Sequence, residues 1–327
     1  MNEFKWAIVG SGQIAEEFAH DIKLAKGQTI QAVVGHTMEK AKDFASAENI
    51  PQYFDNLDTL LQQGGIDAAY IATPHTLHYE QTLQCLSHKI PVLCEKPLAI
   101  NKQQVKEMIT ASEQNNTFLM EGMWIRFLPS IQQVLELIEE NAIGNIVSIK
   151  ADMSYRAPHE AGSRFYNPEK GGGSLLDLGV YPVYLAHLLL GKPNNIQAWA
   201  RLTNEHIDEG CAALFHYSKG MYAVIESSLI MQMEWQAKIY GDKGKITIQR
   251  PWNETPKTIV LETYDGKSVS YPCRWDGKGL HYEIDEVYSC IQKGKIESEH
   301  FCHHFSLDLM ETMDEIRRQT GIQYPME

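Results

Sequence analysis

The sequence lacks three features that would each define a class of protein: a long hydrophobic run, a closely spaced cysteine pair and an excess of positive charge. Its six cysteines are scattered over 327 residues without a CxxC pair, which predicts free thiols in an intracellular chain rather than a disulfide framework. No stretch approaches the roughly 18 consecutive apolar residues of a membrane helix. The apolar run at residues 6–9 is too short for the core of a signal peptide. We therefore expect a cytoplasmic protein with no membrane partner.

The charge balance is acidic, with 29 Lys and Arg against 42 Asp and Glu and a formal net charge of −13. Because nucleic-acid binding requires a basic surface, this balance argues against a nucleic-acid partner. A pocket can still be locally basic and bind a small anion. Hydrophobic residues make up 43% of the chain and charged residues 22%, as in ordinary globular proteins. At about 100–200 residues per domain, the length suggests two domains.

The first 120 residues alternate between short apolar runs and segments with helical periodicity. Strands separated by helices of about 10–15 residues predict βαβ units and a doubly wound parallel sheet. Thr37 and Asn101 are predicted to cap two of the helices, and Asp55 is the candidate cap of a third. The predicted strands are residues 5–9, 30–34, 52–54, 67–72, 91–94 and 117–120, and the predicted helices are residues 14–26, 38–48, 56–63, 78–87 and 101–114.

After Glu121 the pattern changes to alternating apolar and polar residues separated by glycine-containing turns. This alternation is typical of antiparallel strands joined by hairpins. We therefore expect a second, α+β domain with a large, mostly antiparallel open sheet, beginning near residues 120–125. The predicted strands are residues 144–155, 196–203, 212–217, 221–230, 237–240 and 257–263, and the predicted helices are residues 174–190, 282–292 and 307–319.

A glycine-rich turn follows the first predicted strand and opens the first predicted helix. It reads Gly10-Ser11-Gly12-Gln13-Ile14-Ala15 and fits the pattern GxGxxG/A. In this pattern the first glycine permits a tight turn, the second lets the backbone approach a pyrophosphate, and the last small residue keeps the helix close to the sheet. The helix N-terminus supplies N–H donors for the phosphates. The motif predicts a dinucleotide site, with an ordinary tight turn as the alternative.

The end of the second predicted strand favours NADP over NAD. An NAD site usually has an acidic residue about 20 residues after the glycine motif, bonded to the ribose 2′-hydroxyl. Here the first carboxylate, Glu39, falls inside the next predicted helix. His36, Thr37 and Lys40 are candidates to accommodate a 2′-phosphate. Because the usual arginine is missing, NAD stays the alternative, and Lys40 can equally be a solvated helix residue.

Two further segments stand out because they follow predicted strands, where ligands of open α/β sheets bind. One contains Thr73, Pro74, His75 and His78, and the other is Glu95-Lys96-Pro97. A lysine at the end of an apolar strand and before a proline is well placed to meet a ligand, although most surface lysines are only solvated charges.

Together with the glycine turn, the segments TPHTLHYE and VLCEKPLA resemble the Gfo/Idh/MocA family of NAD(P)-dependent oxidoreductases. The resemblance continues through EGMWIRFLP at residues 121–129, GGGSLLDLGVYP at residues 171–182 and DEIRRQTGI at residues 314–322, so it spans almost the whole chain. The segments at 121–129 and 171–182 look closest to the branch that holds dimeric dihydrodiol dehydrogenase and glucose–fructose oxidoreductase.

The resemblance implies a Rossmann domain at residues 1–122, a substrate and dimerisation domain at residues 123–300, and a C-terminal helix within residues 301–327 that packs back on the first domain. It also implies a homodimer or higher homo-oligomer through the C-terminal sheet. The family's catalytic lysine is Lys96, and its DxGxH/Y motif maps to Asp177 and Tyr181. The tyrosine matches the branch that uses this residue as the acid/base. Glu95, with the segment from Thr73 to His78, falls in the family's cofactor-binding set.

These residues suggest hydride transfer between a nicotinamide and a carbinol carbon. A tyrosine at its reference pKa of about 10 is a poor base at neutral pH, and a nearby lysine cation lowers that pKa. Our hypothesis is that Tyr181 exchanges the proton, that Lys96 tunes it and binds the substrate oxygen, and that Asp177 orients a substrate hydroxyl or Lys96. Because Pro182 disfavours the α conformation of Tyr181, the helix either starts or is kinked there.

Trp124 and Arg126 are candidates for substrate contacts, with burial at a domain join as the alternative for Trp124. His75 and His78 are expected beside the nicotinamide, with a structural role as the alternative for His78. A histidine-rich segment precedes the final predicted helix but lacks the spacing of a zinc site. We therefore expect no metal ion.

The leading hypothesis is an NADP(H)-preferring oxidoreductase that acts on a small molecule, namely a sugar, a polyol, a trans-dihydrodiol or a dicarbonyl. A non-catalytic NAD(P)-binding sensor or regulator of the same fold is the alternative from another class. The presence of both Lys96 and Tyr181 favours the enzyme. A biliverdin reductase-like enzyme with a bulky planar substrate is a third possibility, and the sequence leaves the substrate open.

Overall fold

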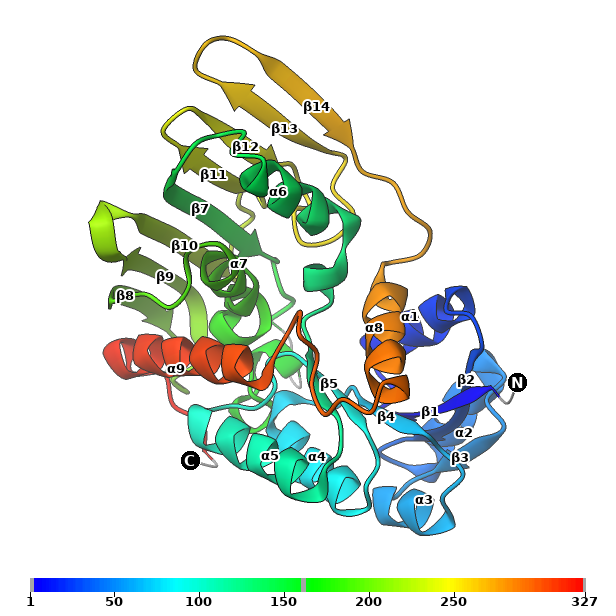
Figure 1. Ribbon diagram of the computed structural model, residues 1–327. Coiled ribbons are helices and arrows are strands. Elements are labelled where there is room, and N and C mark those ends of the chain that lie inside the picture. Colours follow the sequence, from blue (N-terminus) through cyan, green and yellow to red (C-terminus); the bar gives the residue numbers. More distant parts are fainter. Residues whose placement is uncertain (1–2, 160–162, 326–327) are drawn as a thin grey trace. The chain divides into compact units, whose positions relative to one another are not determined.

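The computed structural model describes residues 3–159 and 163–325, which form two compact units (Figure 1). The first unit consists of Met1–Phe127 and Asp276–Leu307, and the second of Leu128–Trp275 and Asp308–Glu327. Each unit therefore contains two separate stretches of the chain.

The first unit contains a six-stranded sheet in the order β3-β2-β1-β4-β5-β6, in which every strand pair is parallel. This is the strand order of a Rossmann fold, and it confirms the predicted doubly wound parallel sheet. The order reverses between β1 and β4, so their carboxyl ends mark the point where dinucleotides bind. The strands are β1 (Phe4–Val9), β2 (Gln28–Val34), β3 (Gln52–Phe54), β4 (Ala68–Ile71), β5 (Val92–Glu95) and β6 (Leu119–Gly122), and the helices between them are α1 (Gln13–Asp21), α2 (Met38–Glu48), α3 (Leu57–Gln63), α4 (His78–Ser87) and α5 (Lys102–Asn115).

Side-chain caps decide where three of these helices begin. Thr37 and Asn101 cap α2 and α5 as predicted, each accepting a hydrogen bond from the backbone N–H three residues on. Asn56 caps α3 in the same way. The prediction that Asp55 caps this helix was wrong, because α3 begins at Leu57 and the residue before it is the cap.

The chain returns to the first unit as α8 (Leu280–Gln292), and a buried carboxylate fixes the start of this helix. Asp21, at the end of α1, accepts hydrogen bonds from the backbone N–H groups of Lys278, Gly279 and Leu280 at 2.7–3.0 Å. These groups have no partner within a helix, so Asp21 caps α8 from a distant part of the chain.

The second unit is built on an eight-stranded sheet in the order β14-β13-β12-β11-β7-β10-β9-β8. Strands β7 and β10 pair in parallel and the other pairs are antiparallel, which confirms the predicted mostly antiparallel sheet. Strands β12 and β14 and helix α6 were not predicted. The strands are β7 (Ile146–Ser154), β8 (Asn195–Leu202), β9 (Asp208–His216), β10 (Tyr222–Ser228), β11 (Ala237–Gly241), β12 (Gly244–Ile248), β13 (Thr258–Thr263) and β14 (Ser268–Pro272), and the α-helices are α6 (Pro129–Glu139), α7 (Val180–Leu190) and most of α9 (His303–Thr320).

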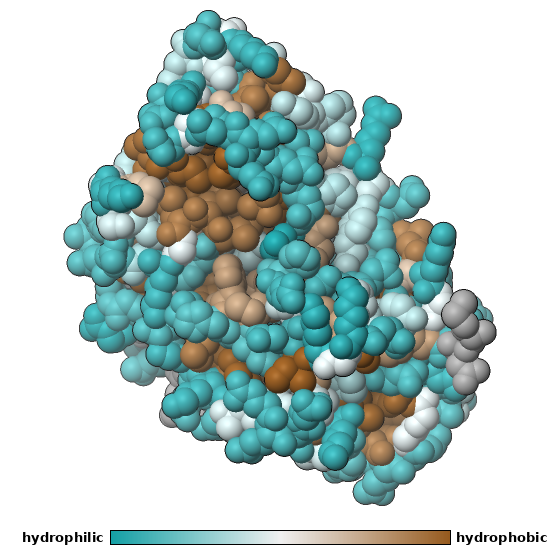
Figure 2. Space-filling view, viewed as in Figure 1, coloured by the Kyte–Doolittle hydropathy of each residue, from teal (hydrophilic) through white to brown (hydrophobic). Residues whose placement is uncertain are grey.

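The two faces of this sheet differ in exposure. Helix α7 packs against β7 and β10 on one face. Figure 2 shows apolar side chains gathered over α7 and beside α6, two helices that carry the half-buried Leu135, Ile138 and Leu188. The strand residues that alternate with the buried ones point to the other face of the sheet, where many are exposed. Trp199 on β8, for example, keeps 66% of its accessible surface.

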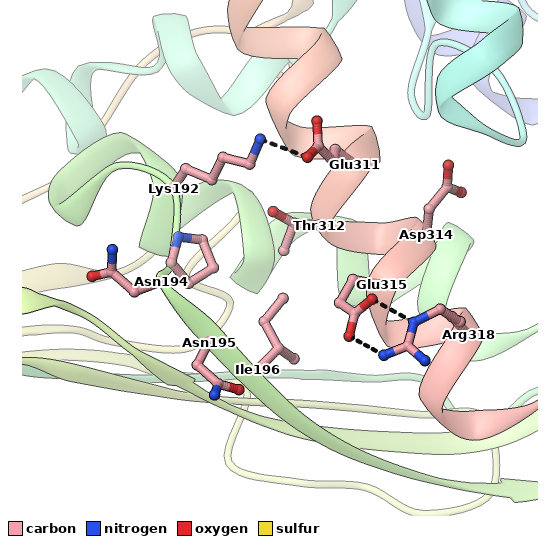
Figure 3. A pocket seen from close by; sticks show the side chains of 10 residues that line it. Lys192, Asn194, Asn195, Ile196, Glu311, Thr312, Asp314, Glu315 and Arg318 are labelled. Atoms are coloured by element: carbon pink, nitrogen blue, oxygen red, sulfur yellow. Dashed lines mark hydrogen bonds and ion pairs between the residues drawn. The ribbon is translucent and has the colours of Figure 1, made fainter.

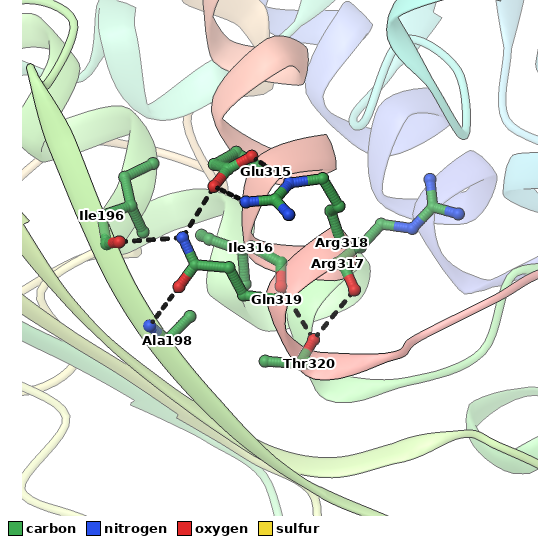
Figure 4. Close-up of polar contacts among 8 residues, drawn as sticks. All are labelled: Ile196, Ala198, Glu315, Ile316, Arg317, Arg318, Gln319 and Thr320. Carbon is green, nitrogen blue, oxygen red and sulfur yellow. Dashed lines mark hydrogen bonds and ion pairs between the residues drawn. The ribbon is translucent and has the colours of Figure 1, made fainter.

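The C-terminal helix α9 is shared between the two units. The packing of residues 301–327 on the first domain stays a prediction, while the boundary between the units falls inside α9 and Asp308–Glu327 belongs to the second unit. The physical reason is a hydrogen-bonded connection to the edge strand β8 (Figure 4). Gln319 Nε2 donates to Ile196 O at 2.8 Å, and Ala198 N donates to Gln319 Oε1 at 2.9 Å.

One described helix, Pro168–Leu190, is long and apolar enough to cross a membrane by length and composition alone. Its residues are apolar on average, although a few polar residues interrupt the apolar run. In its most apolar window 83% of the helix is buried inside the protein, as is typical of a core helix.

Candidate active site

The glycine turn connects β1 to α1 at the carboxyl end of β1. Gly10 has a φ of +114°, and a Cβ at this position would lie 2.5 Å from Ala72 O, so only glycine fits. Gly12 is the N-cap of α1 and provides no side-chain acceptor, and a Cβ on it would meet no atom within 4 Å. The first N–H groups of α1 therefore suit the pyrophosphate of a dinucleotide. Ser11, Gln13 and Ile14 lie around this helix start, and none of them is fully buried.

The residues predicted to meet a 2′-phosphate follow β2. His36, Thr37 and Lys40 are all exposed. The Thr37 hydroxyl accepts a hydrogen bond from Lys40 N at 3.3 Å, so it serves as a helix cap. Gly35 allows this close turn, since a Cβ on it would lie 2.7 Å from Ala41 N. The contribution of the three exposed residues to cofactor choice stays a prediction.

His78 connects the two strand-end segments of the first unit. Its Nδ1 lies 2.9 Å from Pro97 O and its Nε2 lies 2.9 Å from Thr73 O. The ring is fully buried, and burial lowers the pKa of His78 below its usual value. Both ring nitrogens are thus engaged with backbone, which favours the structural role for His78 over contact with the nicotinamide. The neighbouring His75 is buried, with its ring edge-on to that of His78 at 5.8 Å.

Two buried carboxylates hold the loop that carries Lys96. Glu95 Oε1 accepts from the Tyr70 hydroxyl at 2.5 Å, and its Oε2 accepts from Lys96 N at 3.2 Å. On the other side of the lysine, Leu98 N donates to Glu121 Oε1 at 3.1 Å. Burial raises the pKa of Glu121 to about 7. Lys96 itself is half-buried, and the hydrogen bonds from Lys96 N and Leu98 N fix the backbone around it.

Glu121 was missed as a site-supporting residue at the sequence level. A carboxylate inside a predicted strand was the signal that could have identified it. All four residues of β6 are buried, and a buried charge requires a specific partner.

Trp124 and Arg126 lie on the short 3₁₀-helix that follows β6. Trp124 is only 7% exposed, which agrees with the burial alternative. Arg126 Nε donates to His300 O at 3.0 Å, so this side chain holds the segment before α9. Within residues 3–159 and 163–325, no three His, Cys, Asp or Glu side chains gather in an arrangement that could hold a metal ion.

Asp177 and Tyr181 lie on one continuous helix of the second unit. A π-helical stretch, η6 (Leu175–Gly179), carries Asp177 and leads directly into α7, which begins one residue before Tyr181. Pro182 has no N–H to donate to the preceding turn, and the wider π turn before it accommodates this loss without ending the helix. Such single π turns occur frequently at functional sites. Asp177 and Tyr181 are each 6% exposed.

A buried carboxylate from β9 fixes the start of this helix. Asp208 Oδ2 accepts from Ser174 Oγ at 2.8 Å and from Leu175 N at 2.6 Å. Burial raises the pKa of Asp208 to about 6. Gly173 makes the approach possible, because it has a φ of +120° and a Cβ there would lie 2.1 Å from Asp208 Oδ1. Asp208, which is remote in sequence, therefore approaches the backbone closely at Gly173.

Arg164 is the direct partner of Asp177. Its Nη1 donates to Asp177 Oδ1 and its Nη2 donates to Asp177 Oδ2, both at 3.2 Å. The Arg164 side chain is 54% exposed and that of Asp177 is 9% exposed. The guanidinium also lies 4.2 Å from the centre of the Phe165 ring. Nothing in the local sequence marks this arginine, because the loop that carries it has no regular pattern.

A cavity of about 530 Å³ lies between α9 and the start of β8 (Figure 3). Its lining includes Lys192, Asn194, Thr312, Glu315 and Arg318. The charged groups are already paired there: Lys192 with Glu311 at 2.9 Å, and Arg318 with Glu315 at 2.6 Å. None of the predicted site residues lines this cavity.

Comparison with protein families gives two matches. Residues 4–123 match the GFO_IDH_MocA model, described as an oxidoreductase family with an NAD-binding Rossmann fold, and residues 131–247 match the GFO/IDH/MocA C-terminal domain. The chain is similar to trans-1,2-dihydrobenzene-1,2-diol dehydrogenase of Xenopus laevis, with 33% identity over 98% of this chain and 99% of the relative. It is similar to the protein of the same name from Mus musculus, with 29% identity over 99% of this chain and 98% of the relative.

Solved structures share the fold. One is an aldose-aldose oxidoreductase from Caulobacter crescentus complexed with glycerol, with a TM-score of 0.88 and 21% identity over 98% of each chain. Another is a 3-ketoreductase from Actinomadura kijaniata in complex with NADP and TDP-benzene, with a TM-score of 0.87 and 22% identity over 98% of each chain. At these identities the likeness concerns the fold alone.

Proposed function

The chain belongs to the Gfo/Idh/MocA oxidoreductase family, and from this premise we propose that it interconverts a carbinol and a carbonyl in a diol or sugar with NADP(H). It is an NAD(P)-dependent dehydrogenase or reductase. The observation that carries the proposed chemistry is the helix that presents Asp177 and Tyr181 one turn apart, with its start held by Asp208.

The roles of the residues follow from their chemistry. When bound, the nicotinamide supplies or accepts the hydride. Tyr181 exchanges the proton of the substrate oxygen, and the ammonium of Lys96 favours the phenolate form that this exchange requires at neutral pH. Glu95 and Glu121 hold the Lys96 backbone through the hydrogen bonds to Lys96 N and Leu98 N.

The names of the relatives support a neutral, oxygen-rich substrate. The two curated relatives are named for a trans-dihydrodiol, and one structural relative is named for aldoses. We place trans-dihydrodiols first, followed by sugars and polyols, with α-dicarbonyls as substrates for the reverse direction.

We further propose a preference for NADP, a cytoplasmic location and a homodimer or higher homo-oligomer. The preference rests on His36 and Lys40, which are exposed beyond β2, and on the first carboxylate there, Glu39, lying inside α2 and not at the strand end where an acidic residue bonds the ribose 2′-hydroxyl of NAD. The proposal of an oligomer is based on the open face of the eight-stranded sheet. This face exposes Trp199 on β8 and Tyr222 on β10, the two strands on either side of β9.

The test is a screen of NADP⁺ and NAD⁺ reduction with diols and sugars, and of NADPH and NADH oxidation with α-dicarbonyls. Tyr181→Phe removes only the hydroxyl, so we expect turnover to fall at least 10²-fold while NADPH binding, measured by its fluorescence, stays within threefold. Turnover that survives within a few-fold would reject the role of Tyr181. No turnover of any substrate together with tight cofactor binding would instead support a sensor.

A double-mutant cycle tests whether Lys96 and Tyr181 serve the same step. Residues that act as a unit lose less in combination than the product of their single losses. We therefore expect Lys96→Met combined with Tyr181→Phe to be hardly slower than the worse single variant. If the losses of turnover in the two single variants multiply in full, Lys96 and Tyr181 act in different steps.

A further inference from the structure

The loop at residues 163–173 holds a cation against the proposed catalytic helix. Arg164 lies on a short 3₁₀-helix, and its backbone packs against the glycine run that opens the catalytic helix. A Cβ on Gly172 would lie 2.8 Å from Arg164 O, and Gly173 N donates to Phe165 O at 2.9 Å. The backbone that carries the arginine side chain is therefore fixed by packing against the glycine run.

The geometry of the ion pair leaves part of the guanidinium available. An arginine has five N–H donors, and the fork to Asp177 uses one on each terminal nitrogen. The remaining N–H groups have no acceptor among the described residues, and the side chain is 54% exposed against 9% for its partner. The pair thus presents N–H donors outward and keeps its carboxylate inward.

The charges of the pair decide which ligand chemistry it favours. The carboxylate of Asp177 compensates the positive charge of Arg164, so the outward N–H groups offer directed hydrogen bonds with little net attraction for an anion. A neutral hydroxyl or carbonyl oxygen fits such donors better than a carboxylate or a phosphate does. Asp177 stands one helical turn before Tyr181, so a ligand that meets both Arg164 and Tyr181 is expected to carry two oxygens close together.

We propose that Arg164 is the residue that selects substrates with a neutral oxygen on the carbon adjacent to the reacting carbinol, which are vicinal diols and α-hydroxy ketones. This inference rests on the proposed function, because it takes Tyr181 as the residue at the reacting oxygen. Arg164 contacts the neighbouring oxygen, and Asp177 positions its guanidinium.

The experiment compares a vicinal diol, trans-cyclohexane-1,2-diol, with cyclohexanol, which lacks the second oxygen. Sites built to hydrogen-bond a substrate hydroxyl reject analogues without it by about 10⁴-fold. We expect Arg164→Ala to lower kcat/KM at least 10²-fold for the diol and less than threefold for cyclohexanol, so that the preference collapses. Arg201→Ala is the matched control, because Arg201 is also half-exposed and pairs with Glu209 at 2.9 Å. An unchanged preference in Arg164→Ala, or equal losses for both alcohols, would overturn the proposal.

A binding measurement separates this inference from the proposed function. Calorimetric titration of the diol into the NADP⁺-bound protein reports the Arg164 contact without turnover, and we expect affinity to fall at least tenfold in Arg164→Ala. If the variant loses diol binding but wild type shows no turnover, the Arg164 contact is supported and the proposed reaction is rejected. Equal binding by both proteins would reject the contact whatever the turnover.

The charge argument has its own test in Asp177→Asn. This change leaves the guanidinium uncompensated, so we expect the ratio of kcat/KM for lactate over the diol to rise at least tenfold, whatever the absolute rates. A ratio that stays constant would show that Asp177 does not control the charge preference.

Discussion

The buried carboxylate of Asp208 makes stability depend on pH in a direction opposite to that of most surface acids. Asp208 is fully buried and bonds Ser174 Oγ and Leu175 N through one oxygen, while its Oδ1 has no hydrogen-bond partner among the described residues. Burial raises its pKa from 3.8 to about 6. Between these two values the folded state binds the proton more tightly than the unfolded chain does, so stability falls as pH rises through this window and is constant above it.

The magnitude follows from the two pKa values. The difference between 3.8 and about 6 corresponds to about 3 kcal/mol in all, of which about 2.5 kcal/mol falls between pH 4 and pH 7. Asp208→Asn cannot ionise and keeps an oxygen that accepts from Leu175 N. We therefore expect the free energy of unfolding of the variant, relative to that of wild type, to rise by about 2.5 kcal/mol from pH 4 to pH 7, which corresponds to a relative Tm change of roughly 5–10 °C.

The assay is thermal unfolding of wild type, Asp208→Asn and the exposed control Glu205→Gln from pH 4 to pH 7. Differences between proteins cancel the contribution of other buried acids such as Glu121. A Tm difference between wild type and Asp208→Asn that does not change with pH would refute the reasoning. Asp208→Ala loses the acceptor as well, so we expect about 1–3 kcal/mol less stability than Asp208→Asn at pH 7 and a kcat lowered about tenfold.

Three further outcomes follow from the structure. Gly10→Ala requires a strained φ and a contact of 2.5 Å with Ala72 O, so its Tm should fall by more than about 6 °C, whereas Gly12→Ala should keep its Tm within about 2 °C and lose NADPH affinity at least tenfold. Thermal unfolding and fluorescence titration measure both, and equal Tm losses would contradict the assignment. Lys40→Ala should weaken NADPH binding about tenfold and NADH binding less than twofold, because only NADPH carries the 2′-phosphate; parallel losses would remove Lys40 from cofactor selection. Trp199→Glu places a charge on the open sheet face and should shift the mass measured by light scattering from oligomer to monomer, and an unchanged mass would place the interface elsewhere.

Local sequence patterns predicted most of the fold. The Rossmann unit was predictable because each βα unit is marked by nearby residues, such as the glycine turn at Gly10 and the caps Thr37 and Asn101. The second sheet was predictable in kind but not in detail. Strand β12 was overlooked because its short run follows a glycine turn directly, and the parallel pairing of β7 with β10 joins strands about 70 residues apart.

The sequence by itself determined the family, the cofactor class and the helix that carries Asp177 and Tyr181, because those signals are contiguous motifs. Only the tertiary structure showed which distant residues hold these segments in place. Arg164 reaches Asp177 across 13 residues and Asp208 reaches Ser174 across 34, and a hydrogen bond between distant residues leaves no periodic pattern in either segment. The sequence contains no long unbroken apolar run, and only the tertiary structure shows that the apolar helix Pro168–Leu190 is mostly buried and carries Asp177 and Tyr181.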